Sequence, residues 1–452
     1  MGSHVRSAVA PGYLLLCLIL GGSVQAVWGN MLLQLIGVGL IAWAAAAPAK
    51  EPLIHPARQL LWIAILGLAV VLLQLVPLPG SLWPSLGGRA GIAEGYRLLG
   101  LPAPSLPISL APYASLATLL TLIPPIALFC AVVRLKAYRA SWLAVALLGG
   151  TVAGILLGAL QVASAEPELS RWYLYSSTNF GFAVGFFANA NHMALLLVIS
   201  LPFVAALLAS VRKRNVQRYS AALALAAGAA LVIVVGIALN RSLAGYGLGI
   251  PALLASVLIV MRESPGAQRL LGAVAVVLVI AGVVALYFSP TGNREYGVSA
   301  SVSQREMMTK TTFRATRDFL PLGSGLGTFR PVYRLYEDRR GITRVQVNHA
   351  HNDYAELALE LGIPGIALII LFLVWWVAQS VRAWRFQDAG PYARAASIAS
   401  AAVLVHSIVD FPLRTAAISA SFAMCLALLI ERAPVRGKAR PDLRPTRHVV
   451  LD

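Results

Sequence analysis

The residues best suited to chemistry lie in one stretch near the C-terminal end, VNHAHNDYAELALELGIPG at residues 347–365. It holds His349, His351 and Asp353 with two asparagines and two glutamates, in a chain that is 58% hydrophobic and only 12% charged. Such a dense polar cluster beside a membrane-length segment calls for a functional explanation. A neutral histidine can accept a proton from a hydroxyl, with Asp353 or an asparagine holding its tautomer, so general base catalysis is the expected chemistry.

The same stretch predicts a short helix. Asp353 followed by Glu356 has the spacing of a capping box, and Gly362 with Pro364 predicts a stop and a restart before the next apolar segment. We therefore expect a helix over about 354–361, with both histidines just before its first turn. Free main-chain N–H groups at a helix start favour an anion.

Two plainer interpretations of the histidines remain open. Both could be polar loop residues beside lipid headgroups, where histidine titrates without consequence. His349 and His351 could also bind zinc, but Asp353 is their only strong third ligand nearby, so we expect neither a metal nor a cofactor.

The elements that must position this stretch are membrane helices. Long runs rich in Leu, Ala and Val predict an all-α, polytopic transmembrane bundle of about twelve spans. They lie near 12–28, 31–47, 60–78, 113–133, 141–162, 190–211, 219–239, 242–261, 270–288, 362–381, 394–409 and 415–430.

Charge sets the orientation of these spans. Alternate short connections are basic, for example at 134–139 and 212–218, and a basic tail follows the last span. The positive-inside rule then places both termini in the cytoplasm and the histidines on the outer face. Topology accounts for most of the net charge of +18, so no nucleic-acid partner is expected.

We divide the chain accordingly. Residues 1–288 hold nine spans with outer loops at 79–112 and 164–189, and residues 289–361 form a long, basic outer loop. Residues 362–430 hold three more spans, and residues 431–452 form the basic tail. A basic outer loop beside a membrane suggests an anionic ligand.

Other polar residues should lie on that outer face. Arg241 falls between two spans with almost no loop, where it could bind an anion or simply end a helix. Arg305 opens a segment that predicts an amphipathic helix, followed by a tight turn at PLGSGLG. Asn189 and Asn191 enter a span from outside and could bind sugar or diphosphate, although helix capping is the simpler role. His406 and Asp410 are four apart and predict a mutual contact.

Five segments in order resemble the O-antigen ligase family of bacterial membrane glycan ligases and polymerases. They are NFGFAVGFFANANHMALLL, NRSLAGYGLG, REMMTKTTFRATRDFLPLGSGLGTF, HAHNDYAELALELGIPG and HSIVDFPL. The resemblance implies a fold like that of the C-type glycosyltransferases, with a large helical periplasmic loop, in the bacterial inner membrane. It also implies a ligase, active at the periplasmic face, that moves a glycan from undecaprenyl diphosphate to a lipid A core sugar, with inversion and without metal.

The resemblance also assigns roles. It makes His351, which directly precedes asparagine, the catalytic residue, and makes Arg241 and Arg305 the diphosphate ligands. Arg314 stays a rival to Arg305, because the spacing from Arg305 to Pro321 is one residue longer than in the family's motif. Further donor-binding candidates are Asn352, Asn189 and Asn191, and supporting candidates are Asp353, His349 and Tyr354.

Three other functions stay open. A polymerase acting on a second lipid-linked glycan, or a protein O-oligosaccharyltransferase, would use the same residues. A transporter of anionic lipids or glycans would also explain many spans and a basic outer surface, but should carry charges near the midplane of its spans.

Overall fold

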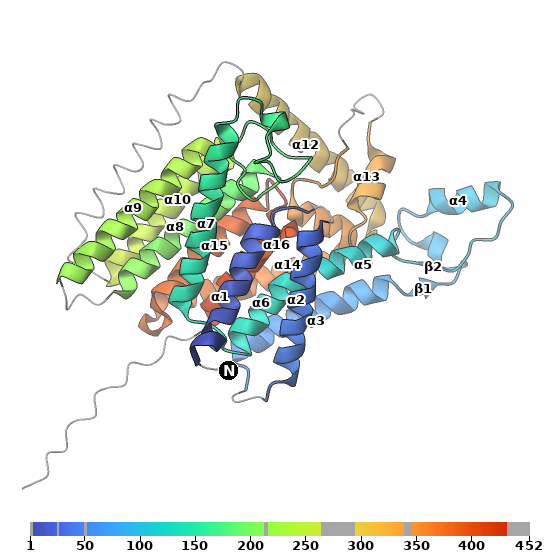
Figure 1. Cartoon of the computed structure of the whole chain (residues 1–452). Helices are drawn as coiled ribbons and strands as arrows, with labels where there is room; N and C mark the ends of the chain where they lie inside the picture. Colours follow the sequence, from blue (N-terminus) through green and yellow to red (C-terminus); the bar gives the residue numbers. More distant parts are fainter. Residues whose placement is uncertain are drawn as a thin grey trace, which may run out of the picture.

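The computed structural model describes residues 3–24, 27–48, 52–211, 216–263, 294–338 and 346–431. The predicted span at 270–288 and residues 432–452 of the predicted tail lie outside this part of the chain. The described residues are mostly helical, and their strands are β1 (Pro77–Leu78) and β2 (Leu106–Pro107), which pair antiparallel (Figure 1). The expected all-α, polytopic membrane fold is confirmed.

The long apolar helices follow the predicted spans. They are α1 (Ser3–Leu20), α2 (Trp28–Ala46), α3 (His55–Gln74), α5 (Pro112–Thr121) with α6 (Ile123–Val133), α7 (Ala140–Val162), α8 (Ala190–Ser210), α9 (Val216–Asn240), α10 (Leu243–Glu263), α14 (Asp353–Arg385), α15 (Gly390–His406) and α16 (Ala416–Ile430). Within the described residues, eight helical segments are long and apolar enough to cross a membrane, and His4–Leu20 and Ala416–Ile430 are shorter apolar helices.

The first predicted span, at 12–28, was wrong in its bounds. Helix α1 begins at Ser3 and ends at Leu20, and residues 21–24 are not helical. After the helix the chain packs closely against a distant segment: a Cβ on Gly22 would lie 2.0 Å from the Phe186 carbonyl oxygen. Hydropathy alone did not detect this break.

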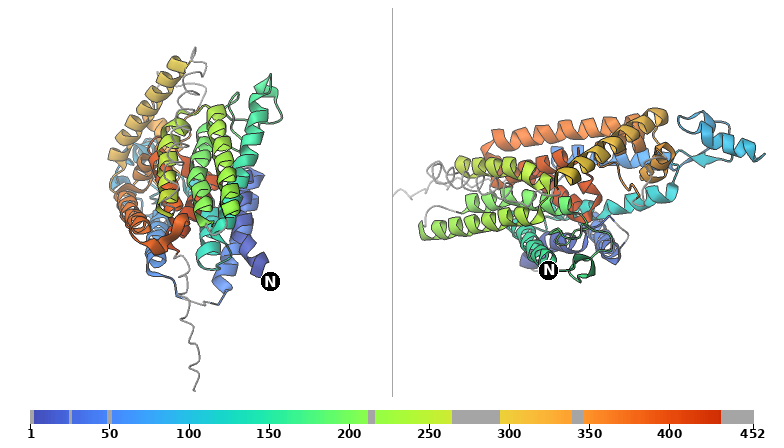
Figure 2. Two further views of the ribbon diagram at one scale, coloured as in Figure 1. Left: turned by 90° about the vertical axis from the view of Figure 1, so that its left-hand side faces the viewer. Right: turned by 90° about the horizontal axis from the view of Figure 1, so that it is seen from above.

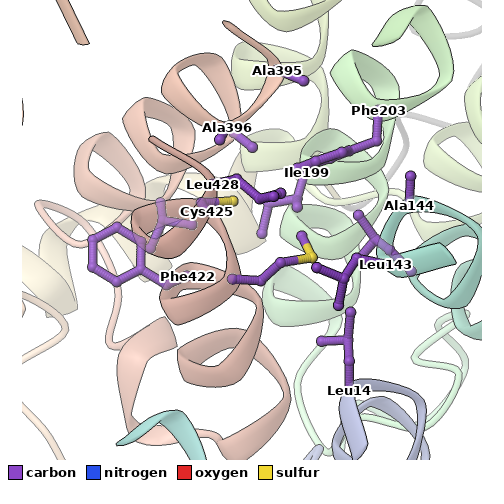
Figure 3. Close-up of a cluster of buried hydrophobic side chains, with 14 of the residues drawn as sticks. Leu14, Leu143, Ala144, Ile199, Phe203, Ala395, Ala396, Phe422, Cys425 and Leu428 are labelled. Atoms are coloured by element: carbon purple, nitrogen blue, oxygen red, sulfur yellow. The ribbon is translucent and has the colours of Figure 1, made fainter. Parts of the chain in front are cut away.

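Helix α8 forms the centre of the bundle. It is buried along most of its length and packs against α7, α9, α10 and α15, while α16 packs against α1, α6 and α15. Figure 3 shows Leu14, Leu143, Ile199, Phe203 and Phe422 meeting in this core. Burial of α8 by its neighbours fixes the position of its polar N-terminal end.

Shorter elements cover the ends of these helices. They are η1 (Trp83–Ser85), α4 (Ala90–Leu98), η2 (Pro167–Leu169), α12 (Arg294–Phe319), α13 (Phe329–Tyr336), η5 (Gln387–Ala389) and η6 (Pro412–Arg414). Helices α12 and α13 belong to the long loop predicted at 289–361. Helix α12 packs against α14, and the view from above in Figure 2 shows the two side by side.

The predicted break before the tenth span is confirmed. Gly362 has φ 63° and ψ −147° inside α14, so the helix is kinked there. The PLGSGLG turn bonds the carbonyl groups that the kink leaves free: Ser324 N donates to Leu359 O at 3.0 Å and Gly325 N to Glu360 O at 2.9 Å. The turn therefore locks the first part of α14, before the kink, to the end of α12.

Candidate active site

The predicted catalytic loop comes directly before α14. Asn352 is the N-cap of this helix, and its side chain accepts from Ala355 N at 2.9 Å. The expectation that Asp353 caps the helix was wrong. Asp353 is the first helical residue and is buried, where it accepts from Ser407 Oγ at 2.9 Å and lies 3.7 Å from Arg414 Nε.

His351 is held in a defined orientation. Its Nδ1 lies 3.2 Å from the carbonyl oxygen of His349, and its ring packs edge-on against Phe411 with centroids 4.9 Å apart. A carbonyl oxygen only accepts, so Nδ1 carries the proton and Nε2 keeps its lone pair. The group that sets the tautomer is thus a main-chain carbonyl, and neither Asp353 nor an asparagine side chain.

The surroundings of His351 favour its neutral form. Burial lowers its pKa, and the positive charge of Arg305 adds to this effect, while the negative charge of Asp410 opposes it. A neutral imidazole with a free Nε2 is the form that can accept a proton.

His349 and Tyr354 hold the loop in place. His349 Nδ1 lies 2.9 Å from Glu356 Oε1, and its ring lies 4.4 Å from that of Phe411. The Tyr354 hydroxyl donates to Leu404 O at 2.8 Å, which ties α14 to α15. These contacts join His349 to α14, and α14 to α15.

Asp410 collects polar groups from four segments. Its side chain is fully buried, accepts from Asn191 Nδ2 at 2.7 Å and lies 3.7 Å from Arg305 Nη2. His192 Nε2 lies 3.7 Å away and His406 Nε2 lies 3.8 Å away. Burial alone would raise the pKa of Asp410, but His192, His406 and His351 hold it below its usual range. The predicted contact between His406 and Asp410 is present, within a larger cluster.

Arg241 lies where predicted, between the end of α9 and the start of α10, with its side chain exposed and φ 60°. Its neighbours anchor it. Asn240 Nδ2 donates to the carbonyls of Ala183 and Ala190, and Ser242 Oγ donates to Asn191 Oδ1 at 2.8 Å. The contacts Ser242–Asn191–Asp410–Arg305 bring the starts of α8 and α10 and the residues after α15 together with the middle of α12.

The two asparagines and Arg314 make contacts within the protein. Asn189 caps α8 by accepting from Asn191 N at 2.8 Å, the simpler of its two expected roles. Asn191 bridges Ser242 and Asp410. Arg314 donates to Tyr336 O at 2.5 Å and lies over the Tyr336 ring, while Arg305 is the arginine beside Asp410.

A second charged cluster was not expected from the sequence. Arg414 lies 3.0 Å from Glu356 Oε1, 3.4 Å from Glu360 Oε2 and 3.7 Å from Asp353 Oδ1. All three carboxylates are buried. Burial would lower the pKa of Arg414, but the carboxylates raise it above its usual range, so it stays charged. The acidic residues at 353, 356 and 360 share one helix face, a spacing that could have revealed the cluster.

Comparison with known proteins relates part of the chain to one family. Residues 228–370 match the family model described as O-antigen ligase. The matched segment includes Arg241, Arg305, His349 and His351 and ends before Asp410. A search of curated proteins finds no match to the chain. The resemblance seen in the motifs is confirmed over residues 228–370.

Proposed function

Because residues 228–370 match the family model described as O-antigen ligase, we propose that the protein transfers a glycan from undecaprenyl diphosphate to a hydroxyl of a lipid A core sugar. The reaction takes place at the periplasmic face of the bacterial inner membrane, with both termini of the chain in the cytoplasm. The observation that carries the proposal is His351, whose Nδ1 faces a carbonyl and whose Nε2 is left to accept a proton.

The reaction needs a base and a stabilised leaving group. His351 Nε2 takes the proton of the acceptor hydroxyl as its oxygen attacks the anomeric carbon, and the bond from that carbon to the diphosphate breaks. Direct attack from the opposite side inverts the anomeric centre. The leaving diphosphate gains negative charge, which guanidinium groups can stabilise.

Arg305 and Arg241 are suited to that second role. Arg305 is about one-third exposed and lies 3.7 Å from Asp410, too far for a hydrogen bond, so its donors are available to a phosphate. Arg241 presents an exposed guanidinium from a well-anchored turn. Arg314 is less suitable because its guanidinium already donates to the carbonyl oxygen of Tyr336. Two guanidiniums would supply the positive charge that other glycosyltransferases take from a metal ion.

The role of His351 is tested by His351→Ala in cells. Removing a general base costs about a hundredfold to ten-thousandfold in rate, so glycan-capped lipopolysaccharide should disappear while the protein remains in the membrane. His55→Ala, an exposed histidine at the start of α3, is the matched control and should keep normal capping. Normal capping in the His351 variant would refute the proposal.

The acceptor is tested with purified protein. Labelled undecaprenyl diphosphate glycan is incubated with lipid A core, with a second lipid-linked glycan or with a pilin-like protein, each with and without chelator. We expect product only with lipid A core, and the same amount of product with and without chelator. Product with the second glycan alone would identify a polymerase, and product with protein alone a protein O-oligosaccharyltransferase. Flipping of the lipid in proteoliposomes without any glycosidic product would indicate a transporter.

A further inference from the structure

We propose that Glu356 is a positioning residue that fixes the main chain carrying His351. The proposal rests on the function of His351 as base. Glu356 uses both carboxylate oxygens on the two residues before His351: Oε1 lies 2.9 Å from His349 Nδ1, and Oε2 accepts from Ala350 N at 2.9 Å. Its side chain is 1% exposed, so these bonds form away from water.

His351 needs such support because of its backbone. Its φ is 52°, in the left-handed region that residues with a Cβ adopt only when their surroundings require it. On its C-terminal side, Asn352 caps α14 and Asp353 N donates to Ser407 O at 2.9 Å. On its N-terminal side, the support comes from Glu356. His351 is thus held between two fixed points.

Glu356 also sets the orientation of the His351 ring through His349. Arg414 Nη2 lies 3.0 Å from Glu356 Oε1 and keeps this carboxylate ionised. An ionised carboxylate only accepts, so His349 donates from Nδ1 and Ala350 from its main-chain N. The carbonyl of His349 in turn accepts from His351 Nδ1 at 3.2 Å. Fixing His349 therefore fixes the acceptor that orients the base.

Loss of this support should reduce turnover more than donor binding. Misplacement of a catalytic group by about 1 Å can cost about a hundredfold in rate. Arg241 and Arg305 do not contact Glu356, so the KM for the lipid-linked donor should change by less than about twofold, and kcat should fall by about ten- to hundredfold.

Glu360 provides a matched control. It is also buried and lies 3.4 Å from Arg414, but its carboxylate accepts from Phe329 N at 3.2 Å, outside the histidine loop. Glu360→Ala removes another acidic side chain from the same guanidinium. A purely structural role of the Arg414 cluster would make both variants lose stability and activity alike.

The experiment compares Glu356→Ala, Glu356→Gln, Glu360→Ala and His351→Ala in the full chain in proteoliposomes. The donor is a fluorescent undecaprenyl diphosphate oligosaccharide, and the acceptor is the one that the unchanged protein uses in the assay above. Rates are given per folded molecule. We expect kcat to fall in Glu356→Ala with KM unchanged, and to stay within about twofold in Glu360→Ala. Glu356→Gln keeps one accepting oxygen, so it should lie between the Ala variant and the unchanged protein, and it decides the matter if the Ala variant does not fold.

Two results would overturn the positioning role while leaving the proposed function intact. One is full kcat in Glu356→Gln together with an inactive His351→Ala. The other is an equal loss of kcat in Glu356→Ala and Glu360→Ala. An active His351→Ala would instead contradict the proposed function, whatever the Glu356 variants do.

Discussion

The Asp410 cluster and the Arg414 cluster lie on either side of the same loop, with opposite charge arrangements. In the first, one buried carboxylate lies among Arg305, His192 and His406, and none of these three comes closer to it than 3.7 Å. In the second, one guanidinium lies among three buried carboxylates, the nearest at 3.0 Å. Arg305 is about one-third exposed, whereas the side chain of Arg414 is 14% exposed.

The difference between the two clusters suits their arginines to different roles. Arg305 can turn from Asp410 to an incoming phosphate at little cost, because its contact with Asp410, at 3.7 Å, is longer than a hydrogen bond and its own side chain is about one-third exposed. Arg414 has no such freedom, since moving it would leave several buried carboxylates unpaired. The Asp410 cluster is therefore suited to ligand exchange, and the Arg414 cluster to holding the loop.

The largest effect is expected from Arg414→Ala. Removing one partner of a buried ion pair costs about 3–5 kcal/mol, so the free energy of unfolding in mixed micelles should fall by about that amount. Arg305→Ala should change it by less than about 0.5 kcal/mol, as for other partly exposed sites. Equal destabilisation by the two substitutions would remove the distinction between the clusters.

Arg305→Ala should instead affect transfer. Losing a preorganised charge that stabilises a leaving group costs about a hundredfold to a thousandfold in rate. Arg314→Ala is the matched control on the same helix and should stay within about twofold of the unchanged rate. Transfer assays in which Arg314→Ala is the slower variant would move the diphosphate role to Arg314.

Arg241→Lys should have a smaller effect. Lysine keeps the positive charge but loses the planar fork that binds two phosphate oxygens at once. We expect the rate of transfer to fall by about tenfold, equivalent to about 1.4 kcal/mol. An undiminished rate would mean that the site needs only a positive charge there, or does not use this residue.

The smallest effect concerns pH. His351 must be neutral to act as base, and its pKa is lowered, so transfer should be lost only as the pH falls below the ordinary histidine value of 6.5. Arg305 helps to lower that pKa, so residual activity in Arg305→Met should show a midpoint shifted to higher pH, whereas Arg305→Lys should not. Rate–pH profiles of the three proteins would show this, and an unmoved midpoint in Arg305→Met would argue against the coupling.

Local patterns predicted much of the framework. The length of the apolar segments predicted the bounds of most helices within a few residues. This works because the burial of a segment in lipid depends on the composition of that segment alone. The break at Gly362 and the cap of α8 at Asn189 also came from local chemistry. At Gly22 and Asp353, where the predictions failed, the chain contacts residues distant in sequence, and a local pattern does not reveal such contacts.

The clusters around the loop could not be predicted in the same way. Asp410 meets Asn191, and Arg414 meets Glu356, only after α8, α14 and α15 have packed together. A charged residue in a short connection such as η6 looks exposed until its partners are known. Polar density at a helix start drew attention to His349 and His351 without the fold, whereas the choice of His351 and of Arg305 came from the family resemblance.

The contact between the PLGSGLG turn and the kink in α14 has a consequence for how such sequences can diverge. A Cβ on Gly323 would lie 2.4 Å from Glu360 O, and one on Gly362 would lie 2.2 Å from Pro321 O. The two motifs are separate in the chain but form one surface, so a change in either requires a compensating change in the other. Relatives should therefore keep or lose P-L-x-G-x-G and L-G-x-x-G as a pair.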